Sequence, residues 1–330
     1  MSGVQNGVLS TQDLSDLFRS YIAAFGPIAE APDALDEEIA RVIPGEGESF
    51  RIPLSPSSNH PEVMDGADPQ RDYEGMEEYY CEGKHRLIAP KSTRRLYDSV
   101  MSSRLQFQLF SDNVMEMLIS APAIWRNLLA KTMDQARRGV LKSYNGQNFF
   151  SLTHPVNPLK PEYKNQANLV QAPLMDKKVA VAAVKLLDNM RGHNNLRINR
   201  NSRRLLLVVP NEDLYVRASE IWTADMIAQA IGANAAAVIK NQLARLGVSI
   251  VKFPELDDYS SKASYLLDVT SGTARAFLIS KVRQVTPYYT GLSPEDEVRR
   301  KSFSVEAGYD AYGGAAVGLH QKAVCIEETT

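Results

Sequence analysis

Residues 264–327 read SYLLDVTSGTARAFLISKVRQVTPYYTGLSPEDEVRRKSFSVEAGYDAYGGAAVGLHQKAVCIE, and this stretch decides the fold class. Short apolar runs at 265–268, 276–279 and 303–307 alternate with Gly, Ser and Pro residues, which commonly end strands. The part that follows residue 303 is rich in tyrosine and glycine: Tyr309, Tyr312, Gly308, Gly313, Gly314 and Gly318. The stretch therefore predicts a series of β-strands.

Length and composition limit the class of protein. The chain has 330 residues, 44% of them apolar, which is enough for one large or two medium globular domains. The formal net charge of −2 does not favour tight binding to nucleic acid or to a membrane surface. Cys81 and Cys325 lie far apart without CxxC spacing, as is typical of reduced, buried thiols in a cytoplasmic product. The sequence predicts neither a signal peptide nor a membrane span, because no apolar run approaches the required length of about 20 residues.

Two short helices are expected near the N-terminus. Apolar residues recur at helical spacing over 12–25 and again over 33–43, and a Gly-Pro or Pro-Gly pair ends each pattern. We interpret residues 1–45 as an arm that docks on a neighbouring molecule, although both helices could instead lie on the surface of their own domain. The arm interpretation predicts unusual exposure, in an isolated chain, for Leu14, Phe18, Ile22 and Phe107.

The next segment, residues 46–111, lacks the pattern of a compact core. Prolines recur from 53 to 69 among Ser, Asn, Asp and Gly, which predicts a long loop that reaches a partner. Residues 79–110 mix aromatic, β-branched and basic positions. We expect part of them to form a projecting hairpin.

The longest helical pattern covers residues 112–138. Pro122 lies inside it, so the helix either kinks near Ser120 or begins at Pro122. Farther along, the spacing predicts a helix over 175–190, a buried strand over 205–209 with a helix that opens near Asn211, and a strand over 248–253. Residues 228–246 form an Ala-rich stretch suited to close packing.

Three segments carry a resemblance to a known family. Residues 144–155, YNGQNFFSLTHP, combine an Asn-Gly turn, a Phe pair and a His-Pro. Residues 203–221, RRLLLVVPNEDLYVRASEI, give a strand, a proline and a helix, and the C-terminal stretch holds a strand ending in Leu267-Asp268, a Pro-containing strand and an acidic loop. In order and spacing these features resemble Mu-type phage major head subunits, capsid proteins with the Hong Kong 97-type fold. The resemblance is good over 144–327 and loose before residue 112.

The resemblance implies an α+β subunit with a peripheral domain, an axial domain, a projecting E-loop and an N-terminal arm. The expected divisions are 1–45 as the arm, 46–111 as the extended loop and E-loop hairpin, 112–150 as the spine helix and start of the peripheral domain, 151–262 as mainly the axial domain, and 263–330 as C-terminal strands returning to the peripheral domain.

The function that the resemblance implies is that of a major capsid (head) protein of a tailed bacteriophage, self-assembling into an icosahedral shell around the double-stranded DNA genome. Its expected partners are other copies in pentamers and hexamers, a separate scaffold protein, a portal, a decoration protein and packaged DNA contacted non-specifically, with no membrane. The expected location is the virion, after assembly in the host cytoplasm. The alternatives are the shell of an encapsulin-like nanocompartment, which shares the fold, and a Ser/His hydrolase.

Two expectations concern maturation. No long charged helix precedes the first core pattern, so we expect the chain to enter the virion uncleaved or nearly so. We also expect no Lys–Asn self-crosslink, although Lys84 and Lys91 could supply the amine.

No motif predicts catalysis. Ser151 and His154, with Asp176 downstream, have the residue types of a hydrolase triad, but no Gly-x-Ser-x-Gly turn surrounds the serine. Four histidines stand alone, without the spacing of a zinc site: His60, His85, His193 and His320. The acidic groups at 257–258 and 295–297 lack the spacing of a calcium loop, and no glycine-rich phosphate-binding loop exists. We therefore expect no enzyme activity and no catalytic, cofactor-binding or metal-binding residues.

Basic residues concentrate in one polar segment, 191–204, where five arginines are interleaved with asparagines. Phosphate contacts use these residue types, but the aromatic side chains that would stack on bases are missing. We favour an interface with acidic loops of a neighbouring copy over DNA binding, and we interpret the basic residues 299–301 in the same way.

Overall fold

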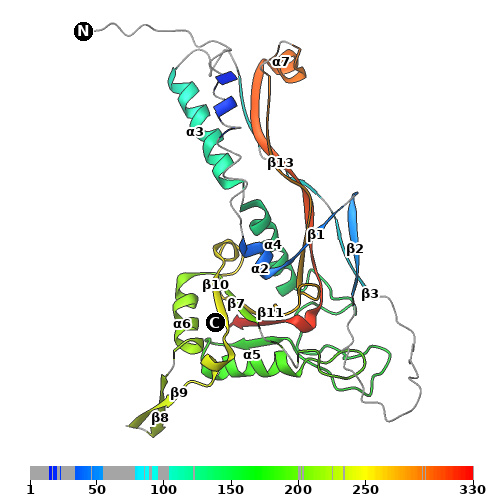
Figure 1. Cartoon of the computed structure of the whole chain (residues 1–330), viewed down its shortest axis with the longest axis vertical. Helices are drawn as coiled ribbons and strands as arrows, with labels where there is room; N and C mark the ends of the chain where they lie inside the picture. Colours follow the sequence, from blue (N-terminus) through cyan, green and yellow to red (C-terminus); the bar gives the residue numbers. More distant parts are fainter. Residues whose placement is uncertain are drawn as a thin grey trace.

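The computed structural model is an α+β protein built on two mixed β-sheets (Figure 1). It describes residues 15–16, 18–20, 23, 34–45, 47–54, 79–84, 86–88, 91–95, 104–121, 123–199, 202, 204–224, 226–232, 235–291, 293 and 295–329. Each of the two larger sheets contains parallel and antiparallel strand pairs. The α+β class predicted from the sequence is therefore confirmed.

A long hairpin forms the first sheet. β12 (Phe277–Thr290) and β13 (Ser304–Val317) pair antiparallel over most of their length. β1 (Arg41–Pro44) lies parallel to β12, while β4 (Arg86–Ile88) and β5 (Lys91–Arg95) pair with β13. These partners come from segments far apart in the sequence, so the hairpin joins the N-terminal and C-terminal parts of the chain.

The helix expected over 33–43 is shorter in the structure. α2 ends at Ile39 (Ala34–Ile39), and 41–44 form β1 instead. Val42 and Ile43 are β-branched and pair with β12, which satisfies their backbone groups better than another helical turn would. The carboxylate of Asp36 forms a buried ion pair with Lys281 of β12 at 2.8 Å, so α2 is fixed against the same hairpin.

Two helices lie along the long hairpin (Figure 1). α3 (Arg104–Ser120) and α4 (Ala123–Arg137) are separated where the sequence contains Pro122, which confirms the predicted interruption near Ser120. α3 begins at Arg104, earlier than the predicted start at residue 112, so residues 104–111 do not belong to an extended loop. Its early turns are stabilised by tertiary packing rather than by strong periodicity, because Phe110 is fully buried there.

The second sheet has the order β10-β7-β11-β14-β6. Its strands are β6 (Leu169–Ala172), β7 (Leu205–Val209), β10 (Ser249–Lys252), β11 (Ala263–Asp268) and β14 (Ala323–Glu328). The predicted strand at 205–209 is confirmed, and so is the helix after it: α6 (Glu212–Trp222) begins at Asn211, whose side chain accepts from the Leu214 N–H. The predicted helix over 175–190 is α5 (Lys177–Asn189), capped by Asp176.

The inner strands β7 and β11 of this second sheet are buried on both faces. Along β7, Leu206 and Val208 point into the core shared with α4, whereas Leu205, Leu207 and Val209 pack with α5 and α6. Alternate residues of a strand face opposite sides of a sheet, so an unbroken apolar run is what such a strand requires.

The C-terminal strands are divided between the two sheets. Residues 263–330 were expected to return together to the part of the molecule that contains the long helix. Instead, β11 and β14 join β7 in the second sheet, and only β12 and β13 run beside α3 and α4. The expectation was wrong for β11 and β14, since strand register depends on long-range pairing that local pattern does not report.

Two strand pairs lie outside the larger sheets. β2 (Ser49–Leu54) pairs with β3 (Tyr79–Lys84), and β8 (Met226–Gly232) pairs with β9 (Ala235–Lys240). The hairpin expected within 79–110 is therefore wrong in its pairing: β3 turns back on β2, and β4 and β5 join β13. Pro53 lies in β2, not in a loop, and the 228–246 stretch holds strand β9 and the short helix η2 (Leu243–Leu246).

Phe18 contradicts the predicted exposure of the arm. Its side chain is 1% exposed and stacks on Tyr289 of β12 at 4.8 Å between ring centroids, with Phe110 edge-on at 6.2 Å. The residue therefore packs against its own chain, because it buries a full aromatic surface there. Leu14, Ile22 and the Phe107 side chain lie outside the described residues.

Candidate interaction site beside helix α4

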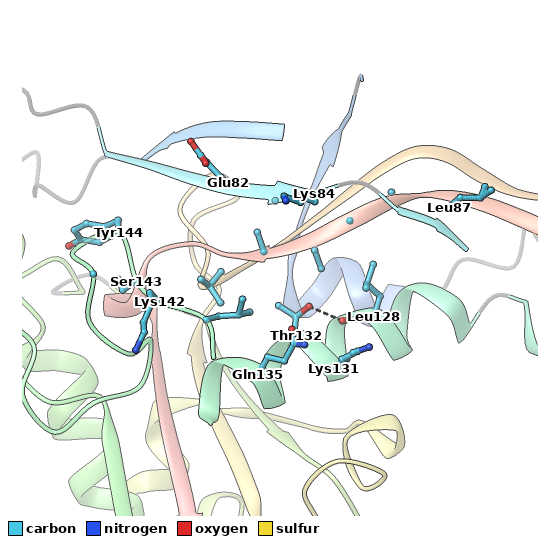
Figure 2. A pocket seen from close by; sticks show the side chains of 18 residues that line it. Glu82, Lys84, Leu87, Leu128, Lys131, Thr132, Gln135, Lys142, Ser143 and Tyr144 are labelled. Atoms are coloured by element: carbon cyan, nitrogen blue, oxygen red, sulfur yellow. Dashed lines mark hydrogen bonds between the residues drawn. The ribbon is translucent and has the colours of Figure 1, made fainter. Parts of the chain in front are cut away.

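A cavity of about 840 Å³ lies between β3, α4 and β13. Figure 2 shows Glu82 and Lys84 on β3 at one side and Lys131 and Gln135 on α4 at the other. The turn at 141–146, which follows α4, closes one end of it. The cavity is thus formed where the β2/β3 pair crosses the long hairpin.

Glycines allow this crossing. A Cβ atom at Gly314 would lie 2.4 Å from the Lys84 carbonyl oxygen, and one at Gly313 would lie 2.3 Å from the Ser280 carbonyl oxygen and 2.7 Å from the Trp125 ring. No side chain fits in these spaces, so only glycine permits β3 and α4 to approach β13 so closely. The Tyr/Gly-rich pattern noticed in the sequence has this structural cause.

The charged side chains around the cavity are three lysines, Lys84, Lys131 and Lys142, and one carboxylate, Glu82. Lys84 and Lys131 are exposed, Lys142 donates to the Asn148 side-chain oxygen, and Glu82 is paired with Arg51. The Thr132 hydroxyl donates to the Leu128 carbonyl at 2.8 Å and is therefore occupied within its helix. This arrangement suits the binding of a peptide segment or an anionic group.

A buried polar cluster supports the turn at the end of the cavity. His154 and His320 are both fully buried, and their rings stack with centroids 4.0 Å apart. The Ser143 hydroxyl lies 2.7 Å from Nδ1 of His320, and the Tyr144 ring stacks on the same histidine at 5.3 Å. The cluster joins the 144–155 segment to the short helix η4 (His320–Lys322), and so fixes Ser143 and Tyr144 at the rim.

Burial determines the protonation of this cluster. Burial lowers the pKa of His154 to about 4. The hydrogen bonds with the Phe149 carbonyl and with Asn168 raise this pKa, but by less than burial lowers it. Burial also lowers the pKa of His320 well below its ordinary value, and the nearby His154 and His193 add to the effect. Both rings are therefore neutral near pH 7. In His154 the Nε2–H donates to the Phe149 carbonyl at 3.1 Å.

Asn168 connects the same loops. Its amide nitrogen donates to the carbonyls of Phe149 (2.9 Å) and His320 (3.2 Å), and its side-chain oxygen accepts from the Ser151 N–H (2.9 Å). Both N–H donors and the oxygen of this fully buried amide are thus hydrogen-bonded. Sequence reasoning missed Asn168, since nothing in its neighbourhood marks it as buried.

The three residues of the hydrolase hypothesis have separate structural roles. The Ser151 hydroxyl accepts from the Thr153 N–H (3.1 Å), His154 binds the Phe149 carbonyl, and Asp176 caps α5 by accepting from the Val179 N–H (2.8 Å). Among the hydrogen bonds of the described residues, none joins Ser151 to His154 or His154 to Asp176. The structure gives this trio no geometry for nucleophilic catalysis.

A buried ion pair lies behind the cluster and was also missed. Nζ of Lys322 contacts Oδ2 of Asp268 at 2.8 Å and Oδ1 of Asn199 at 2.8 Å, and the Ser202 hydroxyl donates to Asp268 at 2.7 Å. Burial raises the pKa of Asp268, but the charge of Lys322 and these hydrogen bonds outweigh it and hold the pKa below its usual range. The Leu267-Asp268 pair of the sequence resemblance is therefore a structural ion-pair site.

The arginines of 191–204 make contacts within their own chain. Arg191 donates to the Asn195 carbonyl at 2.6 Å, and Arg204 pairs with Glu38 at 2.8 Å. Arg197 acts electrostatically on Asp188, while Arg200 and Arg203 lie outside the described residues. Their preference for a neighbouring copy over DNA stays a prediction.

The acidic loops also have local roles. Asp257 accepts a hydrogen bond from the Asn211 amide at 3.0 Å, and Asp296 accepts hydrogen bonds from backbone N–H groups of its own loop.

Within the described residues, no group of three or more His, Cys, Asp or Glu side chains could hold a metal ion. His193 lies beside Tyr144, with ring centroids 5.6 Å apart, while His60 and His85 lie outside the described residues. Among the described helices, none has both the length and the apolar character needed to span a bilayer.

Comparison by sequence finds no matching family model and no matching curated protein. Comparison by structure finds solved structures from phages and from related particles. The chain is similar to a chain in the procapsid of bacteriophage JBD30 (14% identity, 98% of this chain and 77% of the other, TM-score 0.49). It is also similar to a structure from Mycobacterium phage Patience (12%, 100% and 95%, TM-score 0.48) and to the capsid of an empty GTA particle (13%, 100% and 94%, TM-score 0.49).

Proposed function

We propose that the chain is the major capsid (head) subunit of a tailed bacteriophage, with the Hong Kong 97-type fold, and that copies of it assemble into an icosahedral shell around double-stranded DNA. The observation that carries the proposal is a strand pair without a sheet to join. Among the described strands, β8 pairs only with β9, and this pair projects from the rest of the molecule (Figure 1). A two-stranded sheet alone is marginally stable in water, whereas a closed symmetric assembly provides neighbouring copies on which it can pack.

The order of the elements supports the same proposal. A strand pair, β2/β3, precedes the long interrupted helix, the 144–155 segment follows that helix, and the strand-proline-helix step at 205–222 lies within the second sheet and its covering helices. This order agrees with the one implied by the sequence resemblance.

The division of the chain into domains, also a proposal, follows from this order of elements. Residues 1–45 form the N-terminal segment, which contacts its own chain at Phe18 and β1; the E-loop lies within 46–103, 104–150 begin the peripheral domain, and 151–262 form most of the axial domain. β11 and β14 extend the axial sheet, so we assign these two strands to the axial domain and β12–β13 to the peripheral domain.

The proposed role of the chain is structural rather than enzymatic. Its main partners are other copies in pentamers and hexamers, and the cavity beside α4 suits a segment of one of them. A separate scaffold, a portal, a decoration protein and packaged DNA are the further partners, in a virion assembled in the host cytoplasm.

Assembly is the direct test. The purified chain, alone and co-expressed with the gene products that accompany it, is followed by sedimentation velocity and negative-stain microscopy. Closed icosahedral particles are expected. A chain that stays monomeric under all these conditions contradicts the proposal.

Particle contents separate the phage capsid from the encapsulin-like alternative. Particles from a native source are treated with nuclease and then opened. Protected genome-length DNA is expected, whereas an enzyme cargo without DNA would favour the nanocompartment.

A further inference from the structure

One amide side chain joins the turn after α4, residues 143–147, to the buried histidine stack. Oδ1 of Asn145 accepts a hydrogen bond from the Gln147 N–H at 3.2 Å, which fixes the orientation of the amide, and Nδ2 then lies 3.4 Å from Nδ1 of His154. The Nε2–H of His154 donates to the Phe149 carbonyl at 3.1 Å, so Nδ1 of the neutral ring carries no proton. The Asn145 amide therefore donates to His154, and this contact depends on the neutral form of the ring.

The same turn closes one end of the cavity beside α4. Ser143, Tyr144 and Gly146 line the cavity, and Figure 2 shows the first two beside it. The Ser143 N–H donates to the Gln147 carbonyl at 2.8 Å, and the Gly146 N–H donates to the Ser143 carbonyl at 2.9 Å. The Asn145 side chain adds its bond with the Gln147 N–H, so a change at Asn145 weakens the turn directly.

A second proton on His154 disrupts this arrangement. Nδ1 becomes an N–H donor and faces the amide N–H groups of Asn145, so that two donors oppose each other. The amide regains a hydrogen bond with the ring only by turning its oxygen towards Nδ1, and this rotation removes the acceptor of the Gln147 N–H. In either case the turn loses one of the hydrogen bonds that hold it at neutral pH.

His320 cannot accept the proton at a lower cost. Its Nδ1 lies 2.7 Å from the Ser143 hydroxyl, and among the described residues its Nε2 has no hydrogen-bond partner. A protonated imidazole carries an N–H on both nitrogens, so one N–H would stay unsatisfied in this fully buried ring. His154 has a partner at each ring nitrogen and is therefore protonated first.

The surroundings of the stack supply no counter-charge to an added proton. Among the described residues, no carboxylate contributes to the pKa of either stacked ring. The titratable side chains next to the stack are Tyr144 and His193, and His193 lowers the pKa of His320. Lys142, before the turn, and Lys322, in η4, are bound to other side chains. The charge of a protonated ring is therefore stabilised only when the ring gains contact with water.

We propose that Asn145 and His154 form an acid-sensitive switch, in which protonation of His154 releases the turn 143–147 and opens one end of the cavity beside α4 while both larger sheets remain folded. The pKa of His154 is about 4 with the turn closed and returns to about 6.5 once the ring is exposed. The closed turn is therefore fully stable above about pH 6.5 and loses stability as the pH falls towards 4. The switch belongs to the single subunit and does not depend on assembly into a shell.

The first test is hydrogen exchange of the unassembled subunit at pH 7 and pH 4.5, corrected for the intrinsic pH dependence of amide exchange. Protection of the Ser143, Gly146 and Gln147 amides is expected to fall about fifty-fold, the ratio that a pKa of about 4 in the closed turn and about 6.5 in the open turn gives across this range. Because the opening is local, dilute urea should leave these exchange rates unchanged while it speeds exchange in β7. A turn that exchanges at the rate and with the urea dependence of β7 opens only by global unfolding, which overturns the inference.

The second test uses variants of the two switch residues. His154→Gln is expected to remove the effect of pH on the turn, and His60→Gln, a control at a histidine distant in sequence, is expected to preserve it. In Asn145→Asp the carboxylate can accept from both the Gln147 N–H and the protonated Nδ1. The pKa of His154, followed by NMR of its Hε1, should then rise by about one pH unit or more, and the loss of protection at pH 4.5 should be correspondingly smaller. An effect of pH that persists in His154→Gln, or a turn that opens in Asn145→Asp as it does in the wild type, overturns the inference.

Discussion

His154 and His320 stack face to face in the interior, with ring centroids 4.0 Å apart and an angle of 13° between the planes. The two residues come from distant parts of the sequence, and each is fully buried. The stacked rings therefore hold the turn after α4 against the segment that leads into β14.

Acidification is expected to lower the free energy of unfolding of the chain through these histidines. The pKa of His154 is about 4 in the folded chain and about 6.5 in an unfolded one, so the unfolded state binds more protons between these values. Stability is fully present above about pH 6.5 and is lost as the pH falls towards 4, with a slope of up to about 1.4 kcal/mol per pH unit for one histidine. Urea unfolding of the subunit from pH 4.5 to 7.5 measures it. His154→Gln should flatten the profile, and an unchanged slope in that variant would contradict the assignment to His154.

The buried ion pair predicts a large effect from one substitution and a smaller one from two. Lys322→Met leaves Asp268 charged and buried without its partner, which should cost about 3–5 kcal/mol of unfolding free energy. The double variant Lys322→Met/Asp268→Asn removes both charges and should recover part of the loss. Equilibrium denaturation at pH 7 compares the three proteins, and a double variant no more stable than the single one would show that the pair is not the cause.

Gly314 should tolerate no side chain. Gly314→Ala places a methyl group 2.4 Å from the Lys84 carbonyl, so β3 must move away from β13, and a destabilisation of roughly 1–3 kcal/mol is expected. Gly272→Ala serves as the control, because a Cβ atom there meets nothing within 4 Å. Thermal unfolding provides the comparison. Equal melting temperatures for the two variants would mean that the crossing adapts without strain.

The Phe18 side chain is expected to hold the N-terminal segment against its own chain. Phe18→Ala removes a fully buried ring stacked on Tyr289, a change of the kind that costs about 3 kcal/mol or more in cores. The loss should release the segment around Arg19, whose side chain is already exposed, and so speed its tryptic cleavage. Cleavage at the wild-type rate would indicate that the segment is held by other residues.

Local signals in the sequence predicted local structure well. The buried strand at 205–209, the cap at Asn211 and the interruption near Pro122 are encoded by residues a few positions apart, so reading them requires no knowledge of the fold. The start of α3 was missed because its first turns are stabilised by Phe110 packing on Phe18, not by a clear apolar period.

The hydrophobic pattern of the sequence did not predict which strands pair when they lie far apart in the chain. The C-terminal strands are divided between two sheets, and β3 pairs with β2. Both arrangements depend on which sheet edge each strand pairs with during folding. The same holds for the polar cluster: Ser151, His154 and Asp176 suggested a triad by spacing, whereas the true neighbours of His154 are His320 and Asn145. Isolated histidines become informative only when their spatial partners are known.

The position of β14 has a consequence for the timing of synthesis. This strand is the last along the chain, yet it occupies an inner place in its sheet, between β11 and β6. β6 has no other partner among the described strands, so it stays unpaired until the ribosome has released residues 323–328. A nascent chain therefore cannot complete the second sheet until residues 323–328 have been synthesised, and until then β6 and β11 present unpaired edges to other chains.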